Sequence, residues 1–184
     1  MFQNFEQLKI WEFFAKFEMW TLGHVESIVC NNSFICFGLS IVCSRNLDIV
    51  VAVDVSGSTT TSEFNQQVAF LRTVVNAFRI SNSNGARFII FGFDHNINSL
   101  ASSFADPTTR STNLVLQQIN NLILSAGATT IDGAIVQVKE FLNTTSPRNV
   151  PRVVVFLTDG ENYGGPDSLK ISAEELRTVS SINK

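Results

Sequence analysis

A largely apolar run, LDIVVAVD at residues 47–54, constrains the fold of this chain more than any other feature of its sequence. Isoleucine and valine predominate in it, and its hydrophobic residues do not alternate with polar ones. This pattern is typical of a strand that is covered on both faces of its sheet. Hydrophobic residues make up 45% of the 184 residues and charged residues 16%, so the chain can form a substantial core around such a strand.

Further strands and helices are predicted in alternation after this run. Residues 86–94 and 152–159 are two more apolar runs of the same kind, and residues 99–105 are predicted to form a short strand after a turn at residues 94–96. Apolar residues at helical spacing predict the helices, which we place at residues 61–78, 113–124, 131–142 and 168–179. This alternation predicts an α/β fold with a doubly wound, mostly parallel, Rossmann-like sheet.

Polar oxygen atoms are predicted to gather at one edge of that sheet. In open parallel sheets, ligands bind beyond the carboxyl ends of the strands. Two predicted strands end in a carboxylate, Asp54 and Asp159, and Ser56 and Ser58 follow the first of them at alternate positions. Thr129 lies in a turn that leads into a predicted helix. Carboxylate and hydroxyl oxygens are ligands for Mg²⁺ or Mn²⁺ and do not favour zinc or copper.

Three motifs in this order resemble the von Willebrand factor type A (VWA) domain, which is called the I domain in integrins. The D-x-S-x-S motif corresponds to residues 54–58, the threonine-containing turn to Gly127-Ala128-Thr129, and the strand that ends in LTDG to residues 157–160. The resemblance extends from residue 47 to the C-terminus. It implies a metal-ion-dependent adhesion site and a function in protein binding or cell adhesion, and not an enzyme.

The resemblance also implies a role for each of these residues. Ser56 and Ser58 would bind the metal through their hydroxyls, and Thr129 would bind it directly in the ligand-bound state. Asp54 and Asp159 would act directly or through water. The sixth metal position would take an acidic side chain from a protein partner. A loop shift that exchanges Thr129 for Asp159 would tune the affinity.

The chain departs from the family pattern in two respects. Ile131 and Asp132 stand where the turn of the family commonly has threonine and glycine, and Thr130 is an alternative ligand beside Thr129. The sequence ends at Lys184, before the last strands and the closing helix of the family fold. We therefore expect residues 47–184 to be a VWA-like domain that is incomplete at its C-terminus.

Two other functions stay open, a metal-dependent hydrolase or phosphotransferase and a VWA scaffold that does not bind metal. The sequence has no G-x-S-x-G elbow and no G-x-x-x-x-G-K-[ST] loop. No histidine is placed to activate Ser56 or Ser58 as a nucleophile. These observations favour the binding module over the enzyme.

Residues 1–46 differ in composition from the rest of the chain and are expected to form a partly helical extension. They contain both tryptophans and all three cysteines, Cys30, Cys36 and Cys43. Three reduced thiols or one disulfide with a spare thiol are equally compatible with this spacing. Glu6 and Glu12 stand where a signal peptide would be basic, so the start does not predict a signal peptide.

The remaining features bear on partners and location. A net charge of −3 and the absence of a basic run give a nucleic-acid partner no support. The apolar residues 27–43 are interrupted by polar ones, so membrane association is not expected. Asn31 and Asn143 begin N-glycosylation sequons. The sequons and the cysteines favour a secreted, extracellular protein.

Overall fold

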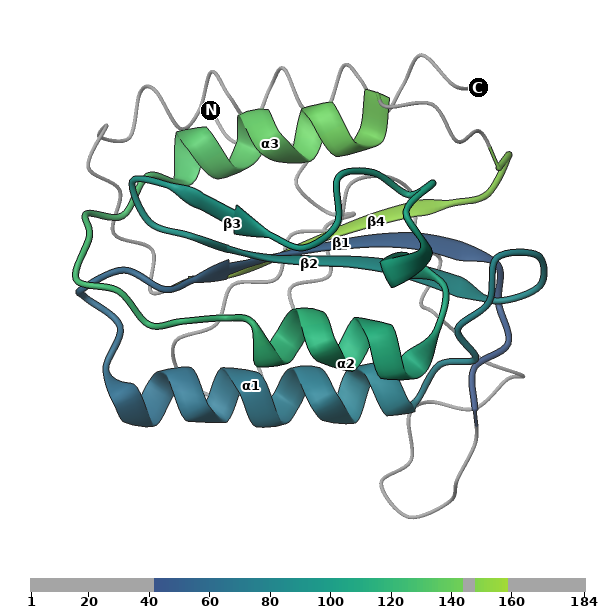
Figure 1. Ribbon diagram of the computed structural model, residues 1–184, viewed down its shortest axis with the longest axis horizontal. Helices are drawn as coiled ribbons and strands as arrows, with labels where there is room; N and C mark the ends of the chain where they lie inside the picture. Colours follow the sequence, from purple (N-terminus) through teal and green to yellow (C-terminus); the bar gives the residue numbers. More distant parts are fainter. Residues whose placement is uncertain (1–41, 144–147, 159–184) are drawn as a thin grey trace, which may run out of the picture.

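The computed structural model describes residues 42–143 and 148–158 (Figure 1). Strands and helices alternate along this part of the chain, in the order β1 (Leu47–Asp54), α1 (Thr61–Asn76), β2 (Ala86–Phe93), β3 (Ile97–Ser99), the 3₁₀ helix η1 (Pro107–Thr109), α2 (Thr112–Asn120), α3 (Ile131–Asn143) and β4 (Arg152–Leu157). The predicted N-terminal helix and the predicted helix at residues 168–179 lie outside the described residues.

The described strands form one four-stranded sheet in the order β3-β2-β1-β4. β1 lies in the middle and pairs in parallel with both β2 and β4, whereas β3 runs antiparallel to β2. Asp54 at the end of β1 is opposite Phe93 of β2, and Val53 is opposite Leu157 of β4. The three parallel strands therefore end at the same edge of the sheet.

Helices cover both faces of this sheet, as the apolar strands require. Figure 1 shows α3 on one face and α1 with α2 on the other. Val50 and Ala52 of β1 pack on the α3 side, and Ile49, Val51 and Val53 pack on the α1 and α2 side. Every residue of β1 and β2 is buried. The prediction of an α/β fold with a mostly parallel sheet is confirmed.

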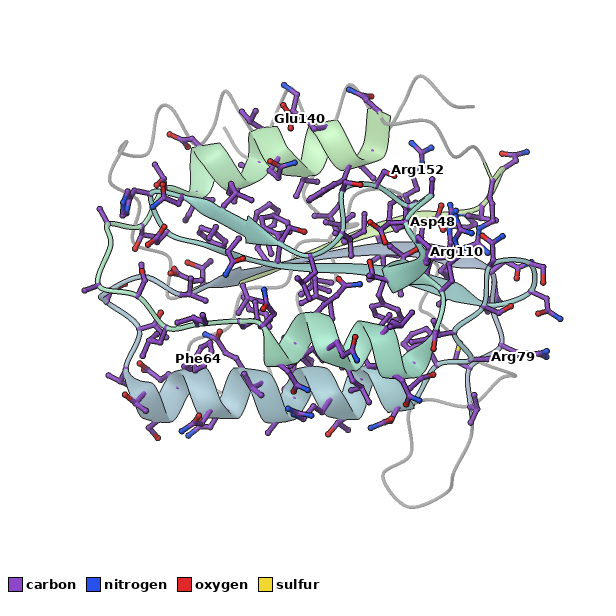
Figure 2. The ribbon with its side chains drawn as sticks, in the orientation of Figure 1. Asp48, Phe64, Arg79, Arg110, Glu140 and Arg152 are labelled. Atoms are coloured by element: carbon purple, nitrogen blue, oxygen red, sulfur yellow. The ribbon has the colours of Figure 1, made fainter. Side chains whose placement is uncertain are left out.

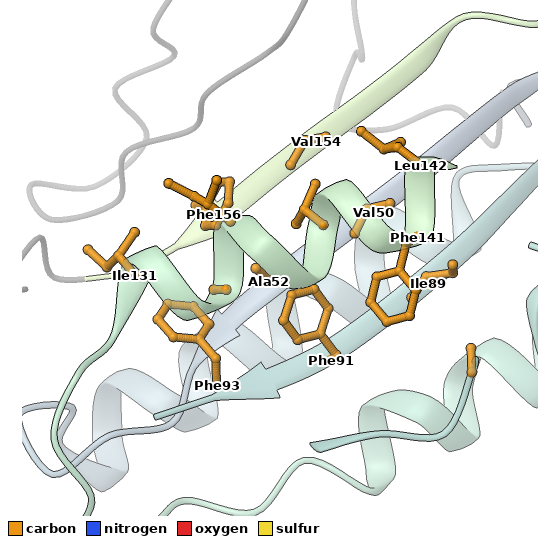
Figure 3. Packing of buried hydrophobic residues seen from close by; sticks show 14 of the residues in the cluster. Val50, Ala52, Ile89, Phe91, Phe93, Ile131, Phe141, Leu142, Val154 and Phe156 are labelled. Atoms are coloured by element: carbon orange, nitrogen blue, oxygen red, sulfur yellow. The ribbon is translucent and has the colours of Figure 1, made fainter. Parts of the chain in front are cut away.

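Phenylalanine and aliphatic side chains pack together in the core between α3 and the sheet (Figure 3). The rings of Phe91 and Phe141 lie 5.5 Å apart between centroids. Phe93 of β2 and Phe156 of β4, the strands on either side of β1, belong to the same layer. Aromatic side chains of this size bury large apolar areas, so these contacts hold α3 against this face of the sheet.

The start of α1 is fixed by a capping box. Thr60 Oγ1 accepts a hydrogen bond from Glu63 N at 3.2 Å, and Glu63 Oε2 accepts one from Thr60 N at 3.0 Å. These bonds satisfy two backbone N–H groups that the first turn of a helix leaves without partners. They also set the point at which the chain leaves the loop at residues 55–60 and enters α1.

Two predicted elements differ from the structure. The predicted strand at residues 99–105 is wrong, because β3 begins at Ile97 and ends at Ser99. The turn before it is tight, since Asp94 Oδ1 already accepts a bond from Asn96 N at 2.5 Å. Helix α2 ends at Asn120, earlier than predicted, because two consecutive asparagines are poor helix residues. As a result, Ile123 is not part of its buried stripe and is 67% exposed.

The other end of the sheet contains a buried ion cluster that the sequence pattern does not reveal. Asp48 and Arg87 are each 1% exposed and form a two-pronged ion pair, with Nε–Oδ1 at 2.8 Å and Nη2–Oδ2 at 2.6 Å. Arg148 Nη2 donates to the same carboxylate at 2.5 Å and to Leu47 O at 2.9 Å. Arg87 Nη1 also donates to Phe104 O at 3.0 Å. This cluster ties β1 and β2 to the segments before β4 and around η1, near the labelled Asp48 in Figure 2.

We expect Arg87→Ala to lower the free energy of unfolding by about 3–5 kcal/mol, because it leaves part of a buried ion pair uncompensated and opens space in the core. The measurement is urea unfolding followed by circular dichroism. Arg72→Ala is the matched control, since Arg72 is exposed and donates one side-chain bond to Asn120, and we expect it to change stability by less than about 1 kcal/mol. Equal effects of the two substitutions would contradict a stabilising role for the cluster.

Candidate metal site

The carboxylate of Asp54 lies at the end of β1, where the three parallel strands stop. Its side chain is fully buried. Oδ1 accepts a hydrogen bond from Ser56 N at 3.0 Å, and Oδ2 accepts one from Thr158 Oγ1 at 2.8 Å. The first bond turns the backbone so that the chain leaves the strand, and the second joins β1 to the residue that follows β4. Asp54 is therefore held in a fixed orientation by its own loop and by the neighbouring strand.

Three hydroxyl groups meet next to this carboxylate. Ser56 Oγ lies 2.7 Å from Thr129 Oγ1 and 3.0 Å from Ser58 Oγ, and the third separation, Ser58 Oγ to Thr129 Oγ1, is 3.3 Å. Ser56 and Thr129 are buried and Ser58 is exposed, so the cluster reaches from the core to the surface. Residues 73 positions apart in the sequence are brought together here, as the motifs predicted.

The spacing of these oxygens fits an octahedral cation. Two adjacent ligands of Mg²⁺, each at about 2.1 Å from the ion, lie about 3.0 Å apart. The three observed oxygen separations, 2.7, 3.0 and 3.3 Å, lie around this value. The same three atoms can thus occupy one face of an octahedron with little movement. The described residues therefore fit a metal that prefers oxygen ligands.

The described residues offer no competing cluster of charged or soft ligands. Among residues 42–143 and 148–158, no group of three or more His, Cys, Asp or Glu side chains is placed to hold a metal ion. The candidate site is built mainly from neutral hydroxyls.

The loop that carries Thr129 is docked on the D-x-S-x-S loop through its backbone. Gly57 N donates to Gly127 O at 2.9 Å, and Ser125 N donates to Val55 O at 2.7 Å. Gly127 also packs so closely on the end of β2 that an added Cβ would lie 2.3 Å from Asp94 Oδ2 and 2.3 Å from His95 Nδ1. A side chain does not fit at this position unless the side chains of Asp94 and His95 move.

Asp94 is the residue of this region that sequence reasoning missed. The sequence predicts Asp94 only as part of a hairpin turn, which it is, but its carboxylate also accepts hydrogen bonds from Ser125 Oγ and Asn96 N. Its carbonyl oxygen accepts one from Thr130 Oγ1. Asp94 directly follows β2, so the rule that selected Asp54 and Asp159, a carboxylate at a strand end, would also have selected it.

The pKa of Asp94 lies below the ordinary value of an aspartate. Burial raises it, but hydrogen bonds from Ser125 and Asn96 and the nearby His95 together outweigh burial and lower the pKa. Each of these contacts favours the charged form of the carboxylate. Asp94 is therefore ionised at neutral pH and acts as an acceptor for both of its partners.

The remaining predicted residues fall in different places. Thr130, the alternative to Thr129, points to Asp94 and not to the serines. Asn143 is exposed at the end of α3. Asp159 and Asn31 lie outside the described residues. Cys43 is disulfide-bonded, which agrees with one of the two cysteine arrangements that the sequence left open.

Comparisons with known proteins identify a family and a fold. A family model, the von Willebrand factor type A domain, matches residues 48–182. Two solved structures of proximal thread matrix protein 1 from the mussel byssus are similar to this chain. The first has 22% sequence identity and a TM-score of 0.57. The second, described "with zinc occupied MIDAS motif", has 21% sequence identity and a TM-score of 0.58. Each alignment covers 73% of this chain and 34% or 35% of the mussel chain, so this chain matches about a third of that protein. No curated protein matches.

Within the part of the chain that the structure describes, none of the helices is both long enough and apolar enough to cross a bilayer.

We expect Gly127→Ala to destabilise the protein and weaken the candidate site, because the new methyl group must displace the hydrogen-bonded side chain of Asp94. Overpacking of this kind costs about 1–3 kcal/mol, which urea unfolding will measure. Gly133→Ala is the control. Gly133 lies in α3, and the nearest atom that its Cβ would meet, Thr130 Cβ, is 3.9 Å away. Gly133→Ala should therefore stabilise the protein by about 0.4–1 kcal/mol. A neutral Gly127→Ala would show that the side chains of Asp94 and His95 make room for the methyl group at little cost.

Proposed function

The chain belongs to the von Willebrand factor type A family, since the model of that family matches residues 48–182, and from this premise we propose that it is a divalent-metal-dependent binding module for protein partners. The observation that carries the proposal is the convergence of the hydroxyls of Ser56, Ser58 and Thr129 within 3.3 Å of one another. These hydroxyls come from two loops that the sheet brings together. Ser58 is the exposed residue of the three, so the group can be reached from solvent there.

We assign the metal to five residues of this chain. Ser56, Ser58 and Thr129 would hold it through their hydroxyls, and Asp54 and Asp159 would hold it directly or through water. When bound, the cation supplies an electron-poor centre for a carboxylate of the partner. The residues of the chain orient that centre, because Asp54 is fixed by Ser56 N and Thr158 Oγ1 before any partner arrives.

Mg²⁺ or Mn²⁺ is the proposed metal. Oxygen ligands about 2.0–2.2 Å from tetrahedral zinc lie about 3.3–3.6 Å apart, and only the longest of the three hydroxyl separations, 3.3 Å, reaches that range. The mean spacing of the three oxygens instead corresponds to an octahedral ion. The zinc named for the mussel protein is the competing possibility, and a metal competition experiment separates the two.

An enzymatic function has less support from the described residues. A serine or threonine nucleophile needs a neighbouring base. His95, the described histidine, contacts Asp94 and Asn96, whereas the hydroxyls of Ser56, Ser58 and Thr129 contact each other. We therefore place this chain among binding modules, with a metal-dependent hydrolase or phosphotransferase and a scaffold without metal binding as the alternatives.

We propose that the protein acts outside the cell. The disulfide of Cys43 requires an oxidising environment to persist. The exposed Asn143 is available to a glycosyl transferase at the end of α3. Residues 47–184 would form the binding domain and residues 1–46 an extension, and no part of this proposal involves nucleic acid or a membrane.

Metal binding is tested by thermal unfolding with increasing Mg²⁺ or Mn²⁺. A ligand that binds only the native state adds about 2.7 kcal/mol at a hundredfold excess over its Kd, which corresponds to a rise in Tm of about 5–10 °C for a domain of this size. Ser56→Ala and Asp54→Ala should abolish this rise. Thr73→Ala should retain it, because the hydroxyl of Thr73 bonds Ala69 O on the exposed face of α1.

The partner is tested by retention on immobilised extracellular proteins with and without EDTA. We expect retention that EDTA abolishes and that Ser56→Ala lacks. The metal proposal fails if Tm is unchanged at millimolar Mg²⁺ and Mn²⁺, or if Asp54→Ala gives the same rise as the wild-type protein. Turnover of a phosphate ester that disappears in Asp54→Ala would favour the enzyme instead.

Glycosylation is tested by secretion from a eukaryotic cell line. We expect the protein to shift to lower mass when treated with peptide N-glycosidase, and Asn143→Gln to remove at least part of that shift. Asn120→Gln is the control, because Asn120 is exposed but does not begin a sequon. An unchanged mass in wild-type protein recovered from the medium would argue against glycosylation at Asn143.

A further inference from the structure

Asp94 holds the segment that carries Thr129 near both of its ends. Its carboxylate accepts a hydrogen bond from Ser125 Oγ before the turn, and its carbonyl oxygen accepts one from Thr130 Oγ1 after it. One residue at the end of β2 thus spans the turn at residues 125–130. Its side chain is nearly buried, with 9% of its surface exposed.

The contact through Ser125 continues into the backbone of the candidate metal site. Ser125 Oγ donates to Asp94 and also accepts a bond from Gly127 N at 3.1 Å. Gly127 O in turn accepts the bond from Gly57 N at 2.9 Å, between the two serines of the D-x-S-x-S loop. A chain of hydrogen bonds therefore runs from Asp94 through Ser125 and Gly127 to Gly57.

The packing of this region leaves little freedom for the turn. The space beside Gly127 is filled by the carboxylate of Asp94 and the ring of His95, 2.3 Å from where a Cβ would lie. The ring of His95 lies against the same carboxylate, with Nδ1 to Oδ2 at 3.4 Å. Asp94 is thus confined by Asn96 and His95 of its own hairpin while it holds the turn.

We propose that Asp94 is a positioning residue for the metal site, which keeps Thr129 Oγ1 beside Ser56 Oγ by holding the turn at Ser125 and Thr130. This inference rests on the proposed function for its effect on metal binding. Asp94 acts through its partners, so its removal should weaken binding of the cation without removing any of the three hydroxyls. An equivalent loss of a supporting hydrogen bond typically reduces metal affinity about 10–100-fold.

The first test compares Mn²⁺ affinity in Asp94→Ala and wild-type protein, with free Mn²⁺ measured by electron paramagnetic resonance. We expect Kd to rise about tenfold or more. Asp106→Ala is the matched control, because the Asp106 carboxylate also accepts bonds from a backbone N–H and a hydroxyl, both of Thr108, but at the start of η1. It should leave Kd within about twofold of wild type.

A second pair of variants keeps the test independent of the folding of Asp94→Ala. Thr130→Val removes the hydroxyl that binds the carbonyl oxygen of Asp94, and Thr130→Ser retains it. We expect Thr130→Val to weaken Mn²⁺ binding and Thr130→Ser to restore it. Equal affinities in these two variants, together with unchanged affinity in Asp94→Ala, would overturn the proposal.

Hydrogen exchange in EDTA gives a readout that does not need the metal. We expect the amides of Gly57 and Gly127 to exchange at least tenfold faster in Asp94→Ala, since both lie on the chain of bonds from Asp94. The amide of Ile90, which Gln118 Oε1 holds at 2.6 Å in the middle of β2, should keep its protection and so report an intact fold. Unchanged exchange at Gly57 and Gly127 would overturn the proposed clamp even if the wild-type protein binds Mn²⁺. Wild-type protein that shows protected amides but no Mn²⁺ binding would instead refute the proposed function and with it the effect of Asp94 on the metal.

Discussion

The central strand β1 carries a buried carboxylate near each end, and the rest of the described structure is arranged around the need to compensate both. A charged group inside a protein is tolerated only with close partners. Asp48 receives Arg87 and Arg148, which tie β2 and the segment before β4 to the amino end of the strand. The carboxylate of Asp54 accepts hydrogen bonds from Ser56 N and Thr158 Oγ1, which join the loop after β1 and the residue after β4 to the carboxyl end of the strand. The apolar residues between them need helices on both faces, and α1, α2 and α3 supply these.

The candidate site follows from this arrangement because parallel strands in register end together. Once Val53 is opposite Leu157, the residue after β4 must lie beside Asp54, and the loops after β1 and before α3 must meet above the same edge. The hydroxyls of Ser56 and Thr129 are then neighbours, although neither strand pairing nor the helices involve these residues directly. The geometry of the site is thus a consequence of the sheet and is refined by local hydrogen bonds such as those of Gly57 and Ser125.

Much of this could be predicted from the sequence, and the parts that could not have a common physical reason. Periodicity and strand-end chemistry predicted the α/β fold and the approach of Ser56, Ser58 and Thr129, because these depend on patterns along the chain. The pairing of Asp48 with Arg87 depends on which strands are neighbours and in which register, and a polar residue inside an apolar run gives no indication of its partner. The boundaries of β3 and α2 depended on a three-residue turn and on two asparagines, and local propensity is weakest at such ends.

The separation of the two carboxylates also determines how stability and binding can vary in this protein. Asp48 and Asp54 are six residues apart on an extended strand, which places them about 20 Å from each other. Effects of substitutions at sites this far apart usually add, because the sites share no contacts. The ion cluster can therefore stabilise the amino end of the sheet independently of substitutions in the loops at the carboxyl end. Asp94 does not follow this separation between stability and binding. It contacts both its own hairpin after β2 and the turn that carries Thr129. Substitutions there change the geometry of the site directly, whereas changes at Asp48 or Arg87 reach the site only through global stability.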